Sequence, residues 1–338
     1  MKAVRVREGD IVQSVDGVFF DVKGLVHPPS RIVAFIRFFP DVSGDRSLGG
    51  TRYSKVYSLD KRFRLLEEKF PQYIFYDPVF DETLCGVPIH QVKRVFRPVE
   101  GLACLRGKKV LDKLESKAVE FAETVKEAAS IPWRSVGVSG SVLIGLHRVS
   151  SDIDLLVYGS ENCLKVYEAL KALMADADVP VKPYGIEGLR RLYRFRSKDT
   201  RVSFEAFVRT EKRKVFQGMF RGTDFYVRFV KGWNEVDTRY GAVRYKKVGY
   251  ATVKARIADD SEALFTPCTY KISQVETVEG TRVEPLLEIA SFRGRFCEQA
   301  RKGETVIARG KIERVITSEK EYYRLLLGGS PDSYMILC

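Results

Sequence analysis

The segment spanning residues 136–159 constrains the fold more than any other part of this 338-residue chain. It starts with a short apolar run, continues with Gly140-Ser141, and after ten intervening residues reaches Asp152 and Asp154 in a second apolar run. Residues at positions i and i+2 of a strand project from one face, about 6.5 Å apart along it. We therefore expect a strand over residues 152–157 with both carboxylates on one face and alternate apolar side chains buried on the other.

Two neighbouring carboxylates predict a metal site. Like charges repel each other, and partial burial penalises both ionised groups unless a cation neutralises them. Hard oxygen ligands suit Mg²⁺, with Mn²⁺ as a substitute, and Mg²⁺ in proteins is held by a few carboxylates together with substrate phosphates. Asp152 and Asp154 are therefore candidate metal ligands and catalytic residues.

The Gly140-Ser141 dipeptide predicts a phosphate-binding turn. It follows an expected strand at residues 135–138 and precedes a short helical turn, so its backbone can approach a ligand closely and free amides can face an anion. The Ser141 hydroxyl adds a donor, and Arg148 and Ser151 in the following loop are further candidates for nucleotide binding. A triphosphate bound there would bring its α-phosphate toward the two aspartates, which is the arrangement for metal-assisted nucleotidyl transfer.

These residues closely resemble the signature of the DNA polymerase β-type nucleotidyltransferase superfamily: an apolar strand, Gly140-Ser141, about ten residues, then Asp-x-Asp at 152–154. The whole chain also resembles an uncharacterised archaeal family of predicted nucleotidyltransferases. The resemblance implies an α/β core with a mixed sheet and the transfer of a nucleoside monophosphate from an NTP to an acceptor hydroxyl, releasing pyrophosphate. It also implies a third carboxylate on a later, neighbouring strand. Val142 and Ile144 occupy positions where relatives often carry basic residues, which leaves the acceptor open.

Glu205 is our candidate for this third carboxylate. Alternating apolar residues predict a strand over residues 201–208, and Glu205 is the one carboxylate inside it. The resemblance implies that this position assists the second metal ion and can accept a proton from the attacking hydroxyl. Asp199 and Glu211, near the expected strand ends, are the alternatives, and an ordinary exposed glutamate is the remaining interpretation.

The basic residues of the chain are concentrated around Glu205. The formal net charge is +13, and residues 182–231 alone hold fourteen basic and five acidic residues. Such a concentration indicates a polyanionic partner, although a solvated basic face without a ligand would look the same. We expect an NTP as substrate and a nucleic-acid acceptor, with RNA favoured over a protein or small molecule. The competing hypothesis is a non-catalytic nucleic-acid-binding protein on a nucleotidyltransferase fold.

The pattern along the chain predicts a multidomain α+β protein. We expect an N-terminal α+β domain at 1–105, the nucleotidyltransferase core at 106–240 and a β-rich domain at 241–338. In the first domain we expect a hairpin around Asp16-Gly17, a helix at 59–70 and a short helix at 89–96. In the core we also expect a helix at 108–129 and a strand at 224–230. Five short strands are expected in the last domain, which therefore reads as a small barrel or sandwich with a resemblance to OB-type barrels.

Composition excludes several classes of protein. No apolar run approaches the ~18 residues of a membrane span, and the first residues lack an apolar signal-peptide core. The six cysteines lie far apart without disulfide or zinc spacing, which favours reduced thiols and a cytoplasmic location. Only two asparagines and six glutamines accompany 101 charged residues, a composition typical of thermophiles.

Overall fold

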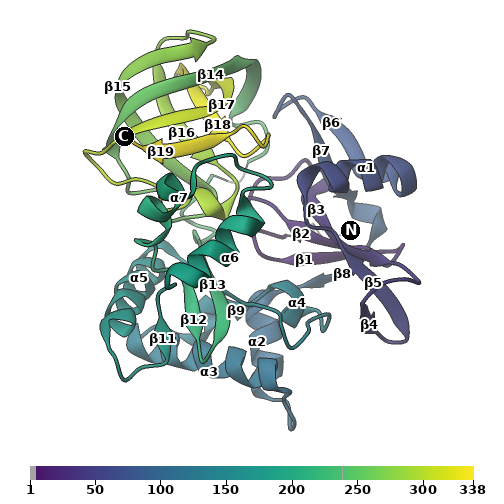
Figure 1. The fold of residues 1–338 in the computed structure, drawn as a ribbon. Helices are drawn as coiled ribbons and strands as arrows, with labels where there is room; N and C mark the ends of the chain where they lie inside the picture. The colour runs from purple at the N-terminus through teal and green to yellow at the C-terminus, as the bar shows by residue number, and fades with distance from the viewer. Residues whose placement is uncertain (1–4, 238) are drawn as a thin grey trace. The chain divides into compact units, whose positions relative to one another are not determined.

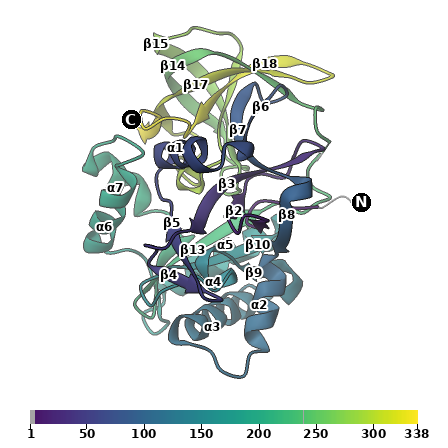
Figure 2. The same ribbon diagram turned by 90° about the vertical axis from the view of Figure 1, so that its right-hand side faces the viewer.

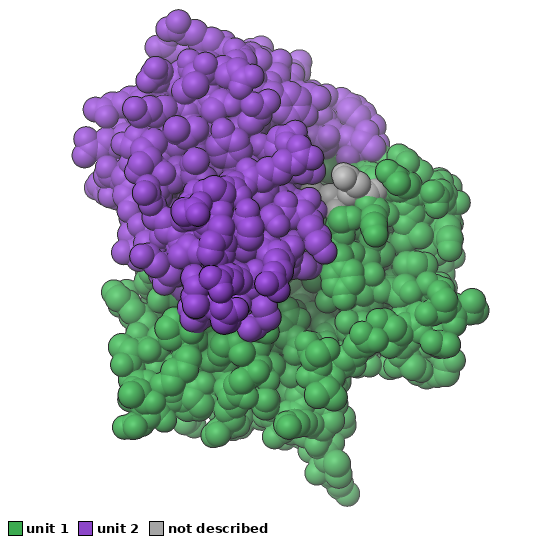
Figure 3. All heavy atoms as spheres, in the orientation of Figure 1, with its two compact units in different colours: residues 1–75, 84–183, 215–238 green, residues 76–83, 184–214, 239–338 purple. Residues whose placement is uncertain are grey.

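The chain is a mixed α+β protein, seen in a computed structural model that describes residues 5–237 and 239–338 (Figure 1). Its described residues form seven α-helices and three sheets. They divide into two compact units, each built from three separate segments (Figure 3). Unit 1 comprises residues 1–75, 84–183 and 215–238, and unit 2 comprises residues 76–83, 184–214 and 239–338. The units therefore differ from the three consecutive domains expected from the sequence.

The N-terminal part of the chain forms an eight-stranded sheet whose main path runs β4-β5-β3-β2-β1-β8, with β7 pairing with β3 and β6 pairing with β7. The sheet belongs to unit 1 except for residues 76–83, which include the end of β6 and the start of β7. Its elements are β1 (Ile11–Ser14), β2 (Phe19–Val22), β3 (Arg31–Pro40), β4 (Arg46–Leu48), β5 (Thr51–Lys55), β6 (Ile74–Asp77), β7 (Glu82–Pro88), β8 (Val92–Phe96), helix α1 (Leu59–Lys69) and the short 3-10 helix η1 (Pro71–Tyr73). The hairpin predicted around Asp16-Gly17 is confirmed, with Val12 opposite Phe20. The helix predicted at 59–70 is confirmed as α1.

The short helix predicted at 89–96 is wrong. Only residues 89–91 form a 3-10 turn, η2 (Ile89–Gln91), and the rest is strand β8. β8 pairs antiparallel with β1, with Val95 opposite Val12. The β-branched Val92 and Val95 are stiff at χ1 and fit a pleated surface, so the tertiary pairing overrides the weak helical spacing.

The second sheet of unit 1 has the order β11-β12-β13-β10-β9. Its strands are β9 (Val136–Val138), β10 (Ile153–Tyr158), β11 (Val181–Lys182), β12 (Gln217–Phe220) and β13 (Thr223–Val230). β10 is antiparallel to β9 and parallel to β13, which makes this a mixed sheet. Both predicted strands that carry aspartates, at 152–157 and 224–230, are confirmed as β10 and β13.

Helices cover one face and one edge of this sheet. They are α2 (Pro98–Arg106), α3 (Lys113–Ala128), the one-turn α4 (Gly140–Leu143) and α5 (Ser160–Ala175), with the 3-10 turn η3 (Trp133–Ser135) leading into β9. α2 packs against β9 and α3 (Figure 2). Phe121 of α3 contacts Phe225 of β13 with ring centroids 4.5 Å apart. An Asp112/Glu115 capping box starts α3 at Lys113, five residues later than the sequence predicts.

Unit 2 contains α6 (Ile186–Arg196), α7 (Phe204–Glu211), the 3-10 helix η4 (Gly294–Phe296) and a six-stranded sheet. The strands are β14 (Arg244–Asp259), β15 (Cys268–Gly280), β16 (Leu286–Ser291), β17 (Thr305–Ile316), β18 (Glu321–Leu327) and β19 (Tyr334–Leu337). The five strands expected from the sequence are present, and β19 is an addition. Pairing follows the circuit β14-β15-β16-β18-β17 and returns to β14, with β16 and β18 parallel. The sheet therefore curves back on itself.

The strand predicted over residues 201–208 is wrong, because α7 occupies this segment. The Ser203 side chain accepts a hydrogen bond from the Ala206 amide and caps the helix. Phe204, Phe207 and Val208 also satisfy the i, i+3, i+4 spacing of a helix face. The apolar residues of this segment therefore fit both a strand and a helix, and the Ser203 cap favours the helix.

Among the helices that the structure describes, none combines the length and the apolar character needed to cross a lipid bilayer.

Candidate active site

The two aspartates lie where the sequence predicts. Asp154 is the second residue of β10 and is partly buried, while Asp152 directly precedes the strand and is exposed. Ile153, Leu155 and Val157 are fully buried on the opposite face. Both carboxylates therefore lie on one face, and the apolar side chains on the other face are packed in the core, as the alternation predicts.

Gly140 lies directly against Asp154. A Cβ atom built on Gly140 would lie 2.0 Å from Oδ2 of Asp154, and the φ of +60° at Gly140 is a conformation that other residues rarely adopt. The adjacent Ser139 amide donates to the Asp154 carbonyl at 2.8 Å, which fixes the turn on the strand. The structure thus brings together the two halves of the motif, and the glycine is required by the carboxylate beside it.

The other predicted nucleotide-binding residues have different surroundings. Ser141 is buried, and its hydroxyl forms no hydrogen bond within the described ranges. Ser151 Oγ accepts from the Arg148 amide at 3.0 Å and closes the loop. The Arg148 guanidinium pairs with Asp45 at 2.8 Å, where both side chains are about half exposed. Ser141 is therefore available to a ligand, whereas Ser151 and Arg148 already have partners.

The carboxylates of Asp152 and Asp154 make neither a hydrogen bond nor an ion pair with any residue that the structure describes. Burial raises the pKa of the Asp154 carboxyl, and the charge of Asp152 raises it further. Arg228, Arg37 and Lys55 act in the opposite direction on the same pKa. The pair is thus destabilised by burial and mutual repulsion, and nearby cations offset only part of this cost.

The three cationic side chains whose charges act on Asp154 differ in whether they form ion pairs. Arg228 on β13 pairs with the buried Glu8 at 2.7 Å. The side chains of Arg37 on β3 and Lys55 at the end of β5 form no hydrogen bond or ion pair in the described part of the chain. Burial lowers the pKa of Lys55 to about 8, the positive charge of Arg37 lowers it too, and Asp152 and Asp154 raise it. The charges of Arg37, Lys55 and the two aspartates therefore act on one another in unit 1. The Lys55 ammonium group also lies over two aromatic rings, 5.0 Å from the centroid of Tyr57 and 5.9 Å from that of Phe38.

Sequence reasoning missed Arg37 and Lys55. They lie more than ninety residues before the aspartates and belong to no motif. Only the pairing of β3 with β5, in which Phe38 is opposite Lys55, brings them to one edge of the N-terminal sheet. No local signal could have identified them.

Glu205 is not brought to the aspartates within unit 1. It lies exposed in the first turn of α7, which belongs to unit 2, so the strand-based reason for choosing it no longer holds. The alternatives Asp199 and Glu211 also lie in unit 2, where both are ion-paired. The strand beside β10 is β13, and since Ile153 is opposite Phe225, Asp224 corresponds in register to Asp152. The signal was present in the sequence, because the expected strand began at Asp224.

A second group of possible metal ligands lies at the start of α3. Ligand atoms of Asp112, Glu115 and His147 lie within 4.8 Å of one another. Each of these side chains has a partner: Asp112 caps α3 and contacts His147 Nε2 at 2.6 Å, and Glu115 pairs with Lys108 at 2.6 Å. The three side chains could offer ligand atoms to a metal ion, but in this structure Asp112 and Glu115 form the N-terminal capping box of α3.

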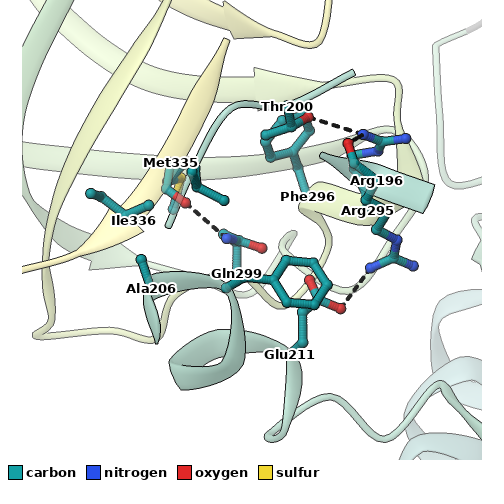
Figure 4. Close-up of a pocket in the computed structure, with 11 residues that line it drawn as sticks. Arg196, Thr200, Ala206, Glu211, Arg295, Phe296, Gln299, Met335 and Ile336 are labelled. Atoms are coloured by element: carbon teal, nitrogen blue, oxygen red, sulfur yellow. Dashed lines mark hydrogen bonds and ion pairs between the residues drawn. The ribbon is translucent and has the colours of Figure 1, made fainter. Parts of the chain in front are cut away.

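Unit 2 contains a pocket between α6, α7 and β19 (Figure 4). Its polar side chains are engaged with one another. Arg196 pairs with Glu211 at 2.6 Å, Arg295 donates to Thr200 at 3.0 Å, and Gln299 donates to the Met335 carbonyl at 2.8 Å. Phe207, Phe296 and Ile336 are among the apolar residues of the lining. These contacts are typical of packing between the two helices and the six-stranded sheet of unit 2.

Comparison with known proteins gave one close relative. The chain is 33% identical over 336 residues to the protein described as "Uncharacterized protein MJ1086" of Methanocaldococcus jannaschii, and the alignment covers 97% of this chain and 96% of the relative. No protein-family model matches the chain. No solved structure matches it.

Proposed function

The chain belongs to the same family as MJ1086 of Methanocaldococcus jannaschii, and for this member we propose metal-dependent nucleotidyl transfer. A nucleoside monophosphate would pass from an NTP to an acceptor hydroxyl, with pyrophosphate as the leaving group. The observation that carries the proposal is the pair of carboxylates at Asp152 and Asp154, which form no ion pair or hydrogen bond among the described residues, with Asp154 packed against Gly140. The resemblance to the DNA polymerase β-type superfamily, stated above for these residues, gives the reaction class.

The residues present fit a divalent cation. Two carboxylates without protein partners, one of them with a raised pKa, form an oxygen donor set that suits Mg²⁺ or Mn²⁺. When bound, the metal polarises phosphoryl oxygens and lowers the pKa of the attacking hydroxyl. Asp152 and Asp154 would hold the metal, and the Ser141 hydroxyl would donate a hydrogen bond to a phosphate oxygen. Gly140, which has no side chain, leaves room for the Asp154 carboxylate.

We propose Asp224 in place of Glu205 as the third carboxylate. The superfamily carries this group on a strand neighbouring the Asp-x-Asp strand, and β13 is the strand parallel to β10. Asp224 stands at the register position of Asp152, on the same face of the sheet.

We propose a nucleic-acid acceptor, with RNA favoured. The pairing circuit of β14 to β18, with its one parallel pair, has the connectivity of OB-type barrels, which bind oligonucleotides on one face. Strand β14 carries exposed basic residues at Lys246, Lys247, Lys254 and Arg256, with the half-exposed Tyr250 among them. Basic side chains that alternate with an aromatic ring suit a single strand.

Pyrophosphate release tests the proposal. Each of the four NTPs would be supplied with Mg²⁺ or Mn²⁺ and a panel of acceptors: single-stranded RNA, structured RNA, DNA and none. We expect turnover that needs the metal, and a loss of about 10³-fold in Asp152→Asn and Asp154→Asn, equivalent to about 4 kcal/mol of transition-state stabilisation. Asp178→Asn, an exposed aspartate of the same unit, serves as the control.

The same assay decides between the two third carboxylates and between the two functions. Asp224→Asn should reduce turnover strongly, whereas Glu205→Gln should leave it unchanged; the reverse would restore the original choice of Glu205. If the wild-type protein binds RNA in a salt-sensitive manner but neither turns over an NTP nor binds one with Mg²⁺, the non-catalytic nucleic-acid-binding function replaces our proposal.

A further inference from the structure

The N-terminal sheet is joined to the motif loop by contacts inside unit 1. Phe38 of β3 packs in one buried cluster with Ile144 and Leu146, which follow Gly140-Ser141 in the chain. The buried Arg46 of β4 donates a hydrogen bond to the Leu146 carbonyl. The edge β3-β5-β4 is therefore fixed on the loop that connects the two halves of the motif.

Arg37 and Lys55 lie on this edge and are charged without being paired. A partly buried lysine normally pairs with a carboxylate, because desolvation of the ammonium group is costly. Lys55 has no such ion pair: the charges of Asp152 and Asp154 act on it without a direct contact, and the positive charges of Arg37 and Arg46 oppose them. Elsewhere in the same sheet Lys23 shows the usual solution, since it pairs with Glu8 at 3.2 Å and Asp21 at 2.7 Å.

The charges of the site become complementary to a polyphosphate once a metal is bound. Arg37 and Lys55 balance Asp152 and Asp154 when no cation is present. Each divalent cation held by the aspartates then adds two uncompensated positive charges, and a nucleoside triphosphate brings about four negative charges at neutral pH. Lysine and arginine are the usual partners of phosphate oxygens, through charge-assisted hydrogen bonds.

We infer that Arg37 and Lys55 bind the triphosphate tail of the nucleotide, so that the N-terminal sheet is one wall of the nucleotide site. The inference rests on the proposed function for the identity of the ligand, and it adds where the phosphates are held and by which part of the chain. It gives the first ninety-six residues a role in substrate binding that the motif itself does not reveal.

Calorimetric titration of the full chain with inorganic tripolyphosphate and Mg²⁺ tests this inference without requiring a reaction or a known base. We expect Arg37→Gln and Lys55→Gln each to weaken tripolyphosphate binding by about 10- to 100-fold, the contribution of one charge-assisted hydrogen bond. Binding of inorganic monophosphate should change much less. Lys55→Arg should retain most of the affinity, and Lys93→Gln, an exposed lysine of β8, is the matched control.

The outcomes separate this inference from the proposed function. If the wild type transfers nucleotides while both glutamine variants, folded by thermal melting, bind tripolyphosphate as tightly as the wild type, the inference is overturned and the proposed function stands. If no nucleotide is transferred but tripolyphosphate binding still depends on Arg37 and Lys55, the phosphate site stands and the reaction does not. If the wild type does not bind tripolyphosphate with Mg²⁺, the inference fails.

Discussion

Each compact unit holds a group of charged side chains, and the two groups differ in whether the charges have partners. In unit 1 the group consists of Arg37, Lys55, Asp152 and Asp154, and none of these four side chains forms an ion pair or hydrogen bond with a residue that the structure describes. The group in unit 2 comprises two sets of ion pairs on and near α6 and α7, one centred on Glu211 and one on Asp199, and a hydrogen bond from Arg295 to the Arg196 carbonyl joins them. The group consists of Arg196, Asp199, Glu211, Lys214, Arg293 and Arg295.

We interpret this difference as one between charges that stabilise the fold and charges that we propose bind a ligand. In unit 2, Glu211 contacts Arg196 at 2.6 Å and Lys214 at 2.7 Å, and Lys214 is almost fully buried. Such a group is costly to break because each removal leaves an uncompensated buried charge. In unit 1 the same cost is already present in the metal-free protein, and a bound metal and polyphosphate would relieve it. Removing one charge from each group tests whether the two groups differ in this way.

The largest effect is expected in unit 2. Glu211→Gln removes the one carboxylate shared by Arg196 and Lys214, and we expect it to lower the free energy of unfolding by about 3–5 kcal/mol. Thermal melting measures the change. Glu187→Gln is the control, since Glu187 pairs with Arg190 in solvent and should contribute less than about 1 kcal/mol. Equal shifts in the two variants would contradict the assignment of a structural ion network.

A smaller effect is expected where the backbone meets the carboxylate. Gly140→Ala and Gly145→Ala both place a side chain at positive φ, which costs about 1–2 kcal/mol. Only the first brings a Cβ into Asp154, whereas at Gly145 the nearest neighbour is a Leu48 methyl at 3.5 Å. We expect Gly140→Ala to be less stable by a further 1–3 kcal/mol or so and to lose nucleotide transfer. Matching melting temperatures and activities in the two variants would remove Gly140 from the site.

The smallest effect has the opposite sign. Without metal, Asp154→Asn should raise the free energy of unfolding by about 0.5–2 kcal/mol, although it abolishes transfer, because it removes a carboxylate held near a like charge. The raised pKa means that the folded protein binds more protons than the unfolded chain, so wild-type stability falls as pH rises from about 4 toward neutrality. The advantage of the variant should therefore grow over that range.

Melting curves in chelator, recorded at several pH values and repeated with excess Mg²⁺, check this prediction. Added Mg²⁺ should stabilise the wild type by mass action and leave Asp154→Asn unchanged. A variant that is less stable than the wild type at every pH would show that Asp154 has a structural role.

The sequence predicts the local structure around the two aspartates well, because the information for it is local. Strand alternation places Asp152 and Asp154 on one face, and the glycine before the helical turn is required by a contact only fourteen residues away in the chain. The third carboxylate is harder to predict, because residues 202–208 fit a strand and a helix equally and a single serine cap decides. Arg37 and Lys55 could not be predicted, since their position depends on pairing between distant strands.

Domain limits were hard to predict for the same reason. The expected boundaries at 105 and 240 follow changes in composition, whereas unit 1 gathers three segments and leaves residues 184–214 to unit 2. Changes in composition along a chain indicate local structure, but they do not show which distant segments pack into the same unit.

The ion pair between Glu8 and Arg228 links residues 220 positions apart, and this separation affects how the protein is made. Synthesis at roughly 5–20 residues per second leaves the N-terminal strands waiting about 10–45 s before Arg228 has been added. During that time β10 lacks its parallel neighbour β13, which follows it by some seventy residues. The order of synthesis thus delays completion of the sheet that carries the proposed site until nearly all of unit 1 has been made. The unpaired edge of β10 is exposed to other chains in the meantime.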